Sequence, residues 1–361
     1  MKHTLSKKWI FPAICCGLSL LAAVCLVLLL RVCTTLPTLG AADSWAGESG
    51  QPFAQIACYL PNEAMLEEED IFSFRQKLDA KLTEAAMEAP ENGALYTDAY
   101  CGKATLTVAG ARGSAEVKVT GVGGDFFRFH PLQLRSGSYL AETDLMKDRV
   151  LLDEELAWKL FGGMDLAGLN VRINDAEYYI AGVVAREKDN YSGLAYTDGA
   201  GMFMCWSALK ACAEDAGISC YEAVLPNPIR SYAANTLREN FPLKDGILVE
   251  NSSRYSVGNL LDVVSNFGKR SMGNNGIIYP YWENAVRLTE DYAALLLVLT
   301  VLFGALPAVM FCVVLVRQGK TFAKKSFRRL KDGVENSRER RRETQWQKYA
   351  GKKDEHGQGT V

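Results

Sequence analysis

The stretch ATLTVAGARGSAEVKVTGVGGDFF, residues 104–127, alternates apolar and polar side chains in two blocks that a glycine-containing turn separates. An alternation with a period of two residues is typical of half-buried β-strands. We therefore expect strands over 104–109 and 115–122. Phe126 and Phe127 follow a glycine-rich turn, and we expect them to anchor a hydrophobic core.

The elements expected on both sides of this stretch mix strands and helices. Further strands are expected at 52–60, 95–100, 150–152, 170–173, 178–184, 202–205, 223–225 and 247–249. Helices are expected at 67–87, 154–161, 207–216, 229–240 and 257–267. This order predicts an α+β domain, a mixed sheet with helices, over residues 52–290.

Two of these helices carry clear local signals. In the helix over 67–87, apolar residues recur at spacings of three and four and share one face: Ile71, Phe74, Leu78 and Leu82. Asp153 is expected to cap the start of the next helix, and Gly162 and Gly163 are expected to end it.

A set of short motifs runs in order from residue 119 to residue 184. The motifs are VTGVGGDFF at 119–127, LRSG at 134–137, LLDE at 151–154, LFGG at 160–163 and IAGVV at 180–184. Their order and spacing resemble the periplasmic core domain of MacB-like ABC transporter permeases, which are related to the FtsX family. The residues that carry the resemblance are Gly121, Asp125, Phe126, Phe127, Gly137, Leu160, Phe161, Gly162, Gly163, Gly168 and Gly182. We interpret them as structural residues and nominate none of them as a binding site.

Two uncharged apolar runs flank the expected domain, at 10–30 and 292–316. About 20 helical residues, each rising about 1.5 Å, cross a hydrocarbon core of about 30 Å. We therefore expect transmembrane helices over 10–32 and 292–316, with a linker over 33–51. The alternative for the first run is a cleaved signal peptide, but the run is longer than the usual apolar segment of about 7–15 residues.

Charge is segregated along the chain, and this predicts its orientation. Residues 1–34 carry a net charge of +4 and residues 317–361 carry +8. Because the whole chain carries −2, the residues between them carry −14. Lys and Arg are enriched on the cytoplasmic side of membrane proteins. Both termini, 1–9 and 317–361, are therefore expected in the cytoplasm, and the acidic domain is expected outside the cell membrane.

The number of apolar runs departs from the family pattern. In MacB-like permeases, a domain of this kind lies between the first and second of four transmembrane helices, and here it also lies between two apolar runs. No run after Val316 is apolar enough to cross a membrane. The resemblance therefore implies a short two-span form, either an accessory subunit or half of a split pair.

Motifs for chemistry are not found. Gly319, Lys320 and Thr321 match the end of a P-loop, but Val314 stands where its first glycine is required. His130 is the one histidine within the expected domain, which argues against a histidine-based catalytic or metal site. We therefore expect no enzyme activity, no catalytic, cofactor-binding or metal-binding residues, and no cofactor. The resemblance then implies a separate ABC ATPase subunit as a partner.

Cysteines leave the disulfide pattern open. Five of them fall in the domain expected outside: Cys58, Cys101, Cys205, Cys212 and Cys220. Disulfides can form in that compartment. Because five is an odd number, at least one thiol stays free or pairs with Cys33 or another chain.

The basic tail is expected to face partners at the membrane. The residues expected to contact a partner subunit are Lys320, Lys324, Lys325, Arg328 and Arg329. Basic residues beside a span also attract anionic membrane lipids, by about 1 kcal/mol each. Aromatic residues are sparse in the tail, so no nucleic acid partner is expected.

The function expected from these features is that of a non-catalytic, permease-like subunit of an ABC transporter complex. Its outer domain transmits ATP-driven motion or binds a cargo that the sequence does not identify. Its partners are a separate ABC ATPase and a full-length permease. The alternative is a membrane-anchored receptor or sensor with an extracytoplasmic ligand-binding domain. A third hypothesis, an anchored hydrolase, lacks a nameable nucleophile and base.

Overall fold

The structure is a computed structural model of the chain, and it describes residues 7–87, 89, 94–196, 198–270, 273–274 and 276–355. The chain divides into two compact units. One unit is Val27–Leu297, which contains the folded domain. The other comprises Met1–Leu26 together with Val298–Val361.

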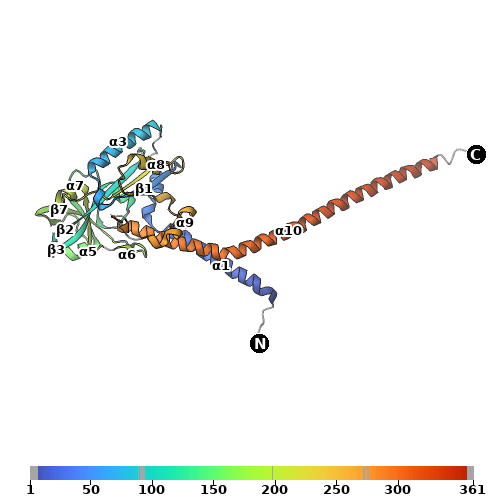
Figure 1. Ribbon diagram of the computed structural model, residues 1–361, viewed down its shortest axis with the longest axis horizontal. Helices are drawn as coiled ribbons and strands as arrows, with labels where there is room; N and C mark the ends of the chain where they lie inside the picture. Colours follow the sequence, from blue (N-terminus) through green and yellow to red (C-terminus); the bar gives the residue numbers. More distant parts are fainter. Residues whose placement is uncertain are drawn as a thin grey trace, which may run out of the picture. The chain divides into compact units, whose positions relative to one another are not determined.

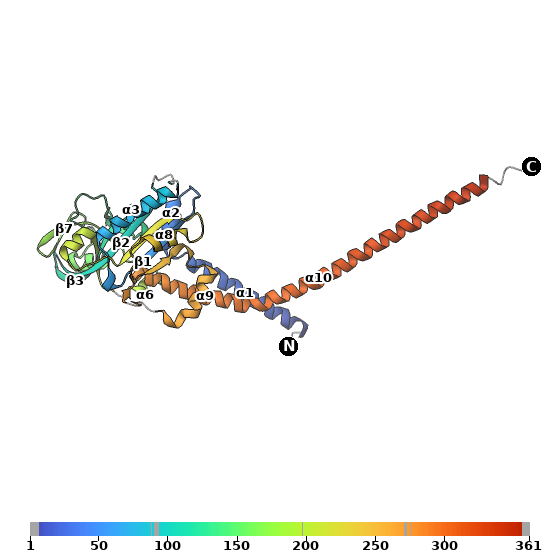
Figure 2. The same ribbon diagram turned by 45° about the horizontal axis from the view of Figure 1, so that its top comes forward.

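The domain is built on one mixed sheet (Figures 1 and 2). Within the described residues its strands are β1 Phe53–Tyr59, β2 Thr97–Gly110, β3 Gly113–Gly124, β4 Leu134–Gly137, β5 Arg149–Asp153, β6 Asn170–Ile173, β7 Ala176–Val184, β8 Gly201–Cys205, β9 Cys220–Pro226 and β10 Ile247–Glu250. Their order is β10-β1-β9-β2-β3-β8-β5-β7-β4, and β6 pairs with β2 and β7. The pairs β3–β8 and β5–β7 are parallel. This confirms the expected mixed sheet.

Helices cover the sheet and extend from it. Those described are α1 Lys7–Cys33, α2 Ala41–Ala46, α3 Glu68–Glu84, α4 Phe126–Phe129, α5 Glu154–Phe161, α6 Ser192–Ala195, α7 Trp206–Cys212, α8 Tyr232–Asn240, α9 Val257–Asn266 and α10 Tyr281–Glu355. Single 3₁₀ turns lie at Pro37–Leu39, Asn62–Ala64, Asn251–Ser253 and Phe267–Lys269. A small second sheet pairs β11 Gly273–Asn274 with β12 Ile277–Ile278.

Each face of the sheet has its own hydrophobic core. One core receives α3, α5, α7 and α8, through buried side chains such as Phe74, Leu160, Trp206 and Leu237. The other receives α2, α4 and the start of α10, through Trp45, Phe126, Phe129 and Trp282. The sheet is therefore a central layer, and α10 begins inside the domain.

Most expected elements are present, but the separation expected between the strands at 95–100 and 104–109 is wrong. The structure has one continuous strand, β2, over Thr97–Gly110. A Cβ on Gly102 would lie 2.3 Å from the Gly217 carbonyl oxygen and 2.6 Å from the Trp206 ring. Gly102 therefore allows a close approach of the chain from α7, and it is not a turn residue.

The helix expected at 67–87 ends at Glu84, and two further expected helices are also shorter than predicted. The helix expected at 207–216 ends at Cys212, and Lys210 Nζ donates to the Ala216 carbonyl in the turn that follows. The helix expected at 229–240 begins at Tyr232, because Ser231 before it has a positive φ of 63°. Both ends are fixed by the turn beside the helix.

The segment expected as a linker, 33–51, is packed against the domain. It contains the 3₁₀ turn Pro37–Leu39 and the helix α2, whose Ala41, Ala42 and Trp45 are buried in the second core. The buried side chain of Gln55 accepts from the Ala41 N–H and donates to the Thr38 carbonyl. This segment is therefore part of the folded domain.

Within the part of the chain that the structure describes, two helices are long and apolar enough to cross a membrane, at Ile10–Cys33 and within Tyr281–Trp346. Their apolar side chains are mostly exposed, including Leu20 and Leu21 in α1 and Val301 and Leu302 in α10. A soluble core helix would bury such residues. The cysteines of the chain, all ten of them, are free thiols in the structure.

Candidate functional site

The residues that carry the family resemblance lie in cores and turns. Phe126 and Leu160 are buried, and Phe127 and Phe161 pack partly buried beside them. Asp125 accepts a hydrogen bond from the Thr97 hydroxyl at 2.7 Å. Among the residues that carry the resemblance, Gly137, Gly162 and Gly168 have positive φ. A Cβ would crowd a neighbour at Gly121 and Gly182 but would meet nothing within 4 Å at Gly163. Their structural role remains a prediction.

The feature that best fits a functional role is the junction between the domain and the first turns of α10. We define the junction as residues 281–294 with the side chains that contact them. Arg254, in the loop before α9, is buried and donates to Glu283 Oε2 at 2.5 Å and to Glu290 Oε1 at 3.2 Å. One guanidinium therefore joins to the domain two positions of α10 that lie about two helical turns apart.

A second arginine extends this network. Arg270 Nη2 lies 2.5 Å from Glu290 Oε2, and its Nε lies 3.0 Å from Asp291 Oδ1. The hydroxyl of Tyr59, at the end of β1, donates to Glu283 Oε2 at 2.9 Å. The junction therefore connects α10 with a sheet strand and with loops on both sides of α9.

Burial makes these charges dependent on one another. Burial alone would lower the pKa of Arg254, but the carboxylates of Glu283 and Glu290 raise it overall. Burial also raises the pKa of Tyr59, and the Glu283 carboxylate adds to this shift. Arg254 therefore stays charged and Tyr59 stays a hydrogen-bond donor at neutral pH. Removal of Arg254 would leave buried carboxylates without their partner.

Aromatic packing completes the inner half of the junction. Trp282 is buried, with its ring centroid 4.4 Å from that of His130 and 5.7 Å from that of Phe126. His130 Nε2 lies 2.5 Å from Glu222 Oε2. The ring of Tyr281 stacks on Tyr196 at 3.9 Å. These rings fix the start of α10 in the second core.

Aliphatic packing forms the outer half of the junction. Ala293 and Ala294 of α10 are buried against side chains from two other helices: Leu29 and Val32 of α1, and Leu260 and Val263 of α9. Small residues allow this close approach of helices. The domain-side ends of both apolar helices are therefore packed together with α9.

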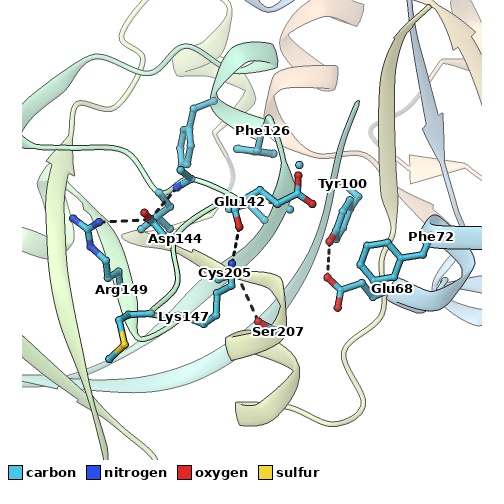
Figure 3. A pocket seen from close by; sticks show the side chains of 17 residues that line it. Glu68, Phe72, Tyr100, Phe126, Glu142, Asp144, Lys147, Arg149, Cys205 and Ser207 are labelled. Atoms are coloured by element: carbon cyan, nitrogen blue, oxygen red, sulfur yellow. Dashed lines mark hydrogen bonds and ion pairs between the residues drawn. The ribbon is translucent and has the colours of Figure 1, made fainter. Parts of the chain in front are cut away.

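A cavity of about 380 Å³ lies at another place on the domain (Figure 3). Figure 3 shows Glu68, Phe72 and Tyr100 on one side of it, and Asp144 and Arg149 on the other. The Tyr100 hydroxyl donates to Glu68 Oε1 at 2.6 Å. Burial and the Glu68 carboxylate raise the pKa of Tyr100, so it remains a donor.

The rim and wall of the cavity suit a small amphipathic molecule. Lys147 Nζ donates to the Glu142 carbonyl at 2.7 Å, and Arg149 pairs with Asp144 at 3.5 Å. Phe126 and Phe127 contribute the apolar wall. An apolar wall with a few polar groups is typical of ligand sites. The sequence did not predict this cavity, because its lining comes from segments far apart in the chain.

The basic residues expected to contact a partner lie along α10. Lys320, Lys324, Lys325 and Arg329 are exposed, and the side chain of Arg328 is outside the part that the structure describes. Among the described residues, no group of three His, Cys, Asp or Glu side chains could hold a metal ion.

The class of the domain follows from a family comparison. Residues 49–216 match the family model of the MacB-like periplasmic core domain. This confirms the resemblance predicted from the motifs at 119–184. The chain thus carries a MacB-like periplasmic core domain, the type found in MacB/FtsX-like ABC transporter permeases, a family that is generally non-catalytic. Two candidate spans flank this domain, which is consistent with a membrane protein.

Three solved structures are similar to parts of the chain. The periplasmic region of MacB from Actinobacillus actinomycetemcomitans is 14% identical, with a TM-score of 0.41, over 61% of this chain and 94% of that one. The extracellular domain of the noncanonic ABC-type transporter YknZ from Gram-positive bacteria is 15% identical, with a TM-score of 0.37, over 52% and 92%. A domain of a permease protein from Porphyromonas gingivalis is 14% identical, with a TM-score of 0.32, over 56% and 89%. A comparison with curated protein sequences gives no match.

Proposed function

We propose that the chain is a non-catalytic, permease-like subunit of an ABC transporter complex that transmits ATP-driven motion to its extracytoplasmic domain. The observation that carries this proposal is the junction, in which Arg254 and Arg270 hold Glu283, Glu290 and Asp291 of α10. Arg254, Glu283 and Glu290 of this set are buried. Paired charges of this kind resist sliding, because a displacement leaves a buried charge unpaired. Movement of α10 is therefore passed to the domain.

The length of α10 supports the same mechanism. The helix is continuous from Tyr281 to Glu355, so it includes the junction, the apolar run and the basic tail. A force applied to the tail by a cytoplasmic ATPase would therefore act on the junction through one continuous helix, which contains Pro307 within its apolar run.

The partners of this proposal are a separate ABC ATPase and a full-length permease. The contact surface is the exposed basic set on α10, Lys320, Lys324, Lys325 and Arg329, together with Arg328. The same cations attract anionic lipid headgroups beside the span. In this arrangement both termini are cytoplasmic and the domain is extracytoplasmic.

The test is copurification of the full chain from native membranes in a gentle detergent. We expect an ABC ATPase to copurify. A variant with Lys320, Lys324, Lys325 and Arg329 changed to Glu should lose it. The matched control reverses four exposed charges further along the same helix: Arg338, Arg340, Arg341 and Arg342. The proposal fails if no ATPase copurifies, or if both variants behave alike.

A receptor or sensor is the second candidate, and the cavity beside Tyr100 is the observation that favours it. In this case a small amphipathic ligand, or a cargo, would bind between Glu68 and Arg149. Binding of a small-molecule library to the purified chain, lost in Phe127→Asp but kept in Phe161→Ala, would support it. Binding that needs no ATPase partner would favour the receptor over the transporter subunit.

A further inference from the structure

The short helix α9 exposes an apolar stripe that the folded domain does not cover. Val257 is 62% exposed, Leu261 53%, Val264 42%, and Phe267, which follows the helix, 63%. Spacings of four and three residues place the first three on one face of the helix. Contiguous exposed apolar residues of this kind mark an interaction surface on a soluble protein or a membrane contact.

The other residues of α9 separate into buried apolar residues and exposed polar residues. Leu260 and Val263 are buried against the ends of α1 and α10. At roughly 100° per residue, they lie next to the exposed stripe on the helical wheel. The polar residues occupy the remaining arc and are exposed: Asn259, Asp262, Ser265 and Asn266. One apolar arc is thus half covered by protein and half uncovered.

The contacts of α9 place it where both apolar helices begin or end. Leu29 and Val32 belong to the last turns of α1, and Ala293 and Ala294 belong to the start of the apolar run in α10. Figures 1 and 2 both show α9 beside the first part of α10. If these runs cross the bilayer, α9 lies at the level of its outer interface.

We propose that α9 is an interfacial helix whose stripe, Val257, Leu261, Val264 and Phe267, is inserted into the outer leaflet of the membrane. Exposed apolar residues also lie at the same ends of the two spans, Leu30 in α1 and Leu295 in α10. Helices with one apolar and one polar face lie in the plane of the membrane interface.

If the lipid bilayer covers the apolar stripe, no further protein is needed to cover it. The residues beside it that face water are uncharged or acidic on α9 itself, while Lys269 is exposed just after Phe267 and can reach lipid phosphates. Tyr292, 46% exposed at the start of the apolar run, fits the aromatic belt of a membrane interface. The membrane thereby holds the edge of the domain next to the junction.

The test is site-specific photo-crosslinking of the full chain in its native membrane. A photoactivatable phenylalanine analogue replaces Leu261 in one variant and Asp262, on the polar arc of α9, in the matched control. We expect several-fold more phospholipid adduct at position 261 than at position 262, measured by mass spectrometry. Position 264 serves as a second site on the stripe if the first variant is not retained in the membrane.

A probe at Leu21, an exposed residue inside the first apolar run, separates two kinds of failure. Lipid adducts at 21 but none at 261 and 264 overturn the interfacial helix and leave the membrane spans intact. Protein adducts in place of lipid at 261 overturn it as well, and they identify the stripe as a subunit contact. If no lipid adduct forms at position 21, the first apolar run does not cross the membrane. That result would contradict both the interfacial helix and the proposed function, because both require this span.

Discussion

Gly162 and Gly163 are adjacent, yet their surroundings differ. Gly162 ends α5 in the left-handed region, with a φ of 77°, and its N–H donates to the Trp158 carbonyl at 2.8 Å. Gly163 has no left-handed φ, and a Cβ there would meet nothing within 4 Å. At the scale of single residues, the conformation of the backbone therefore decides which glycine is needed.

We expect Gly162→Ala to lower the free energy of unfolding by about 1–2 kcal/mol, the cost of placing a Cβ in the left-handed region. Gly163→Ala, the matched control, should change it by less than about 0.5 kcal/mol, since it replaces a residue without such a constraint. The measurement is thermal unfolding of the purified chain in detergent, followed by tryptophan fluorescence. Equal shifts for the two variants would contradict the assigned roles.

Asp153 makes two structural contacts with one carboxylate. Oδ1 accepts from the Leu156 N–H and Oδ2 accepts from the Gly201 N–H, both at 2.7 Å. Asp153→Ala should therefore cost about 1 kcal/mol for the lost helix cap and about 1 kcal/mol more for the partly buried Gly201 N–H left unpaired. Asp153→Asn keeps one acceptor oxygen and should lose less. Chemical denaturation of both variants checks the ranking, and a larger loss for Asn would disprove it.

Among the elements, the first turns of α10 carry the largest expected effect. Arg254 is buried between Glu283 and Glu290, whereas Arg238 is exposed and donates to Asn235 on its own helix. Removing one partner of a buried ion pair leaves an uncompensated charge, which usually costs about 3–5 kcal/mol. Substitution of Arg254 in the junction should therefore lower the free energy of unfolding far more than substitution of a surface arginine.

We expect Arg254→Met to lower the free energy of unfolding by about 3–5 kcal/mol and to uncouple α10 from the domain. Arg238→Met, the control, should stay within about 0.5 kcal/mol of the unchanged chain. Thermal melts give the stability, and limited proteolysis before Tyr281 reports whether α10 has detached. A melt of Arg254→Met that matches the control would show that the junction does not hold α10.

For the whole molecule, topology is the property on which the proposed function depends. Two uncharged runs flank the acidic domain, and cations cluster at the cytoplasmic ends expected for both. Because the domain is expected outside, protease added to intact cells should cut it. The basic tail should be protected by the membrane.

The expected result is a protected C-terminal fragment that contains the apolar run 292–316, detected through a tag on the tail. Alkaline carbonate should leave the undigested chain in the membrane pellet. About 20 apolar residues suffice for one span, and both runs are long enough to hold the chain in the bilayer. Permeabilised cells are the control, in which the tail is digested too. An intact domain in unbroken cells, or a chain washed off by carbonate, would contradict this topology.

Local signals in the sequence were enough to predict several features of the fold. The alternation at 104–127, the cap at Asp153 and the turn at Gly162 each act within a few residues, and the structure has strands, a cap and a helix end there. The motifs at 119–184 predicted the family. Residue types along one element were sufficient in these cases, because the physical cause is itself local.

The order of residues was sufficient to predict two apolar runs, a segregated charge and a mixed α+β domain of a known family. Three other features became apparent from the folded chain: Gly102 lies inside a strand, the segment 33–51 packs into a core, and Arg254 and Arg270 hold the start of α10. The tertiary structure also forms the cavity and leaves the apolar stripe of α9 uncovered. The reason is that burial and charge pairing depend on neighbours far apart in the chain, which no local pattern specifies.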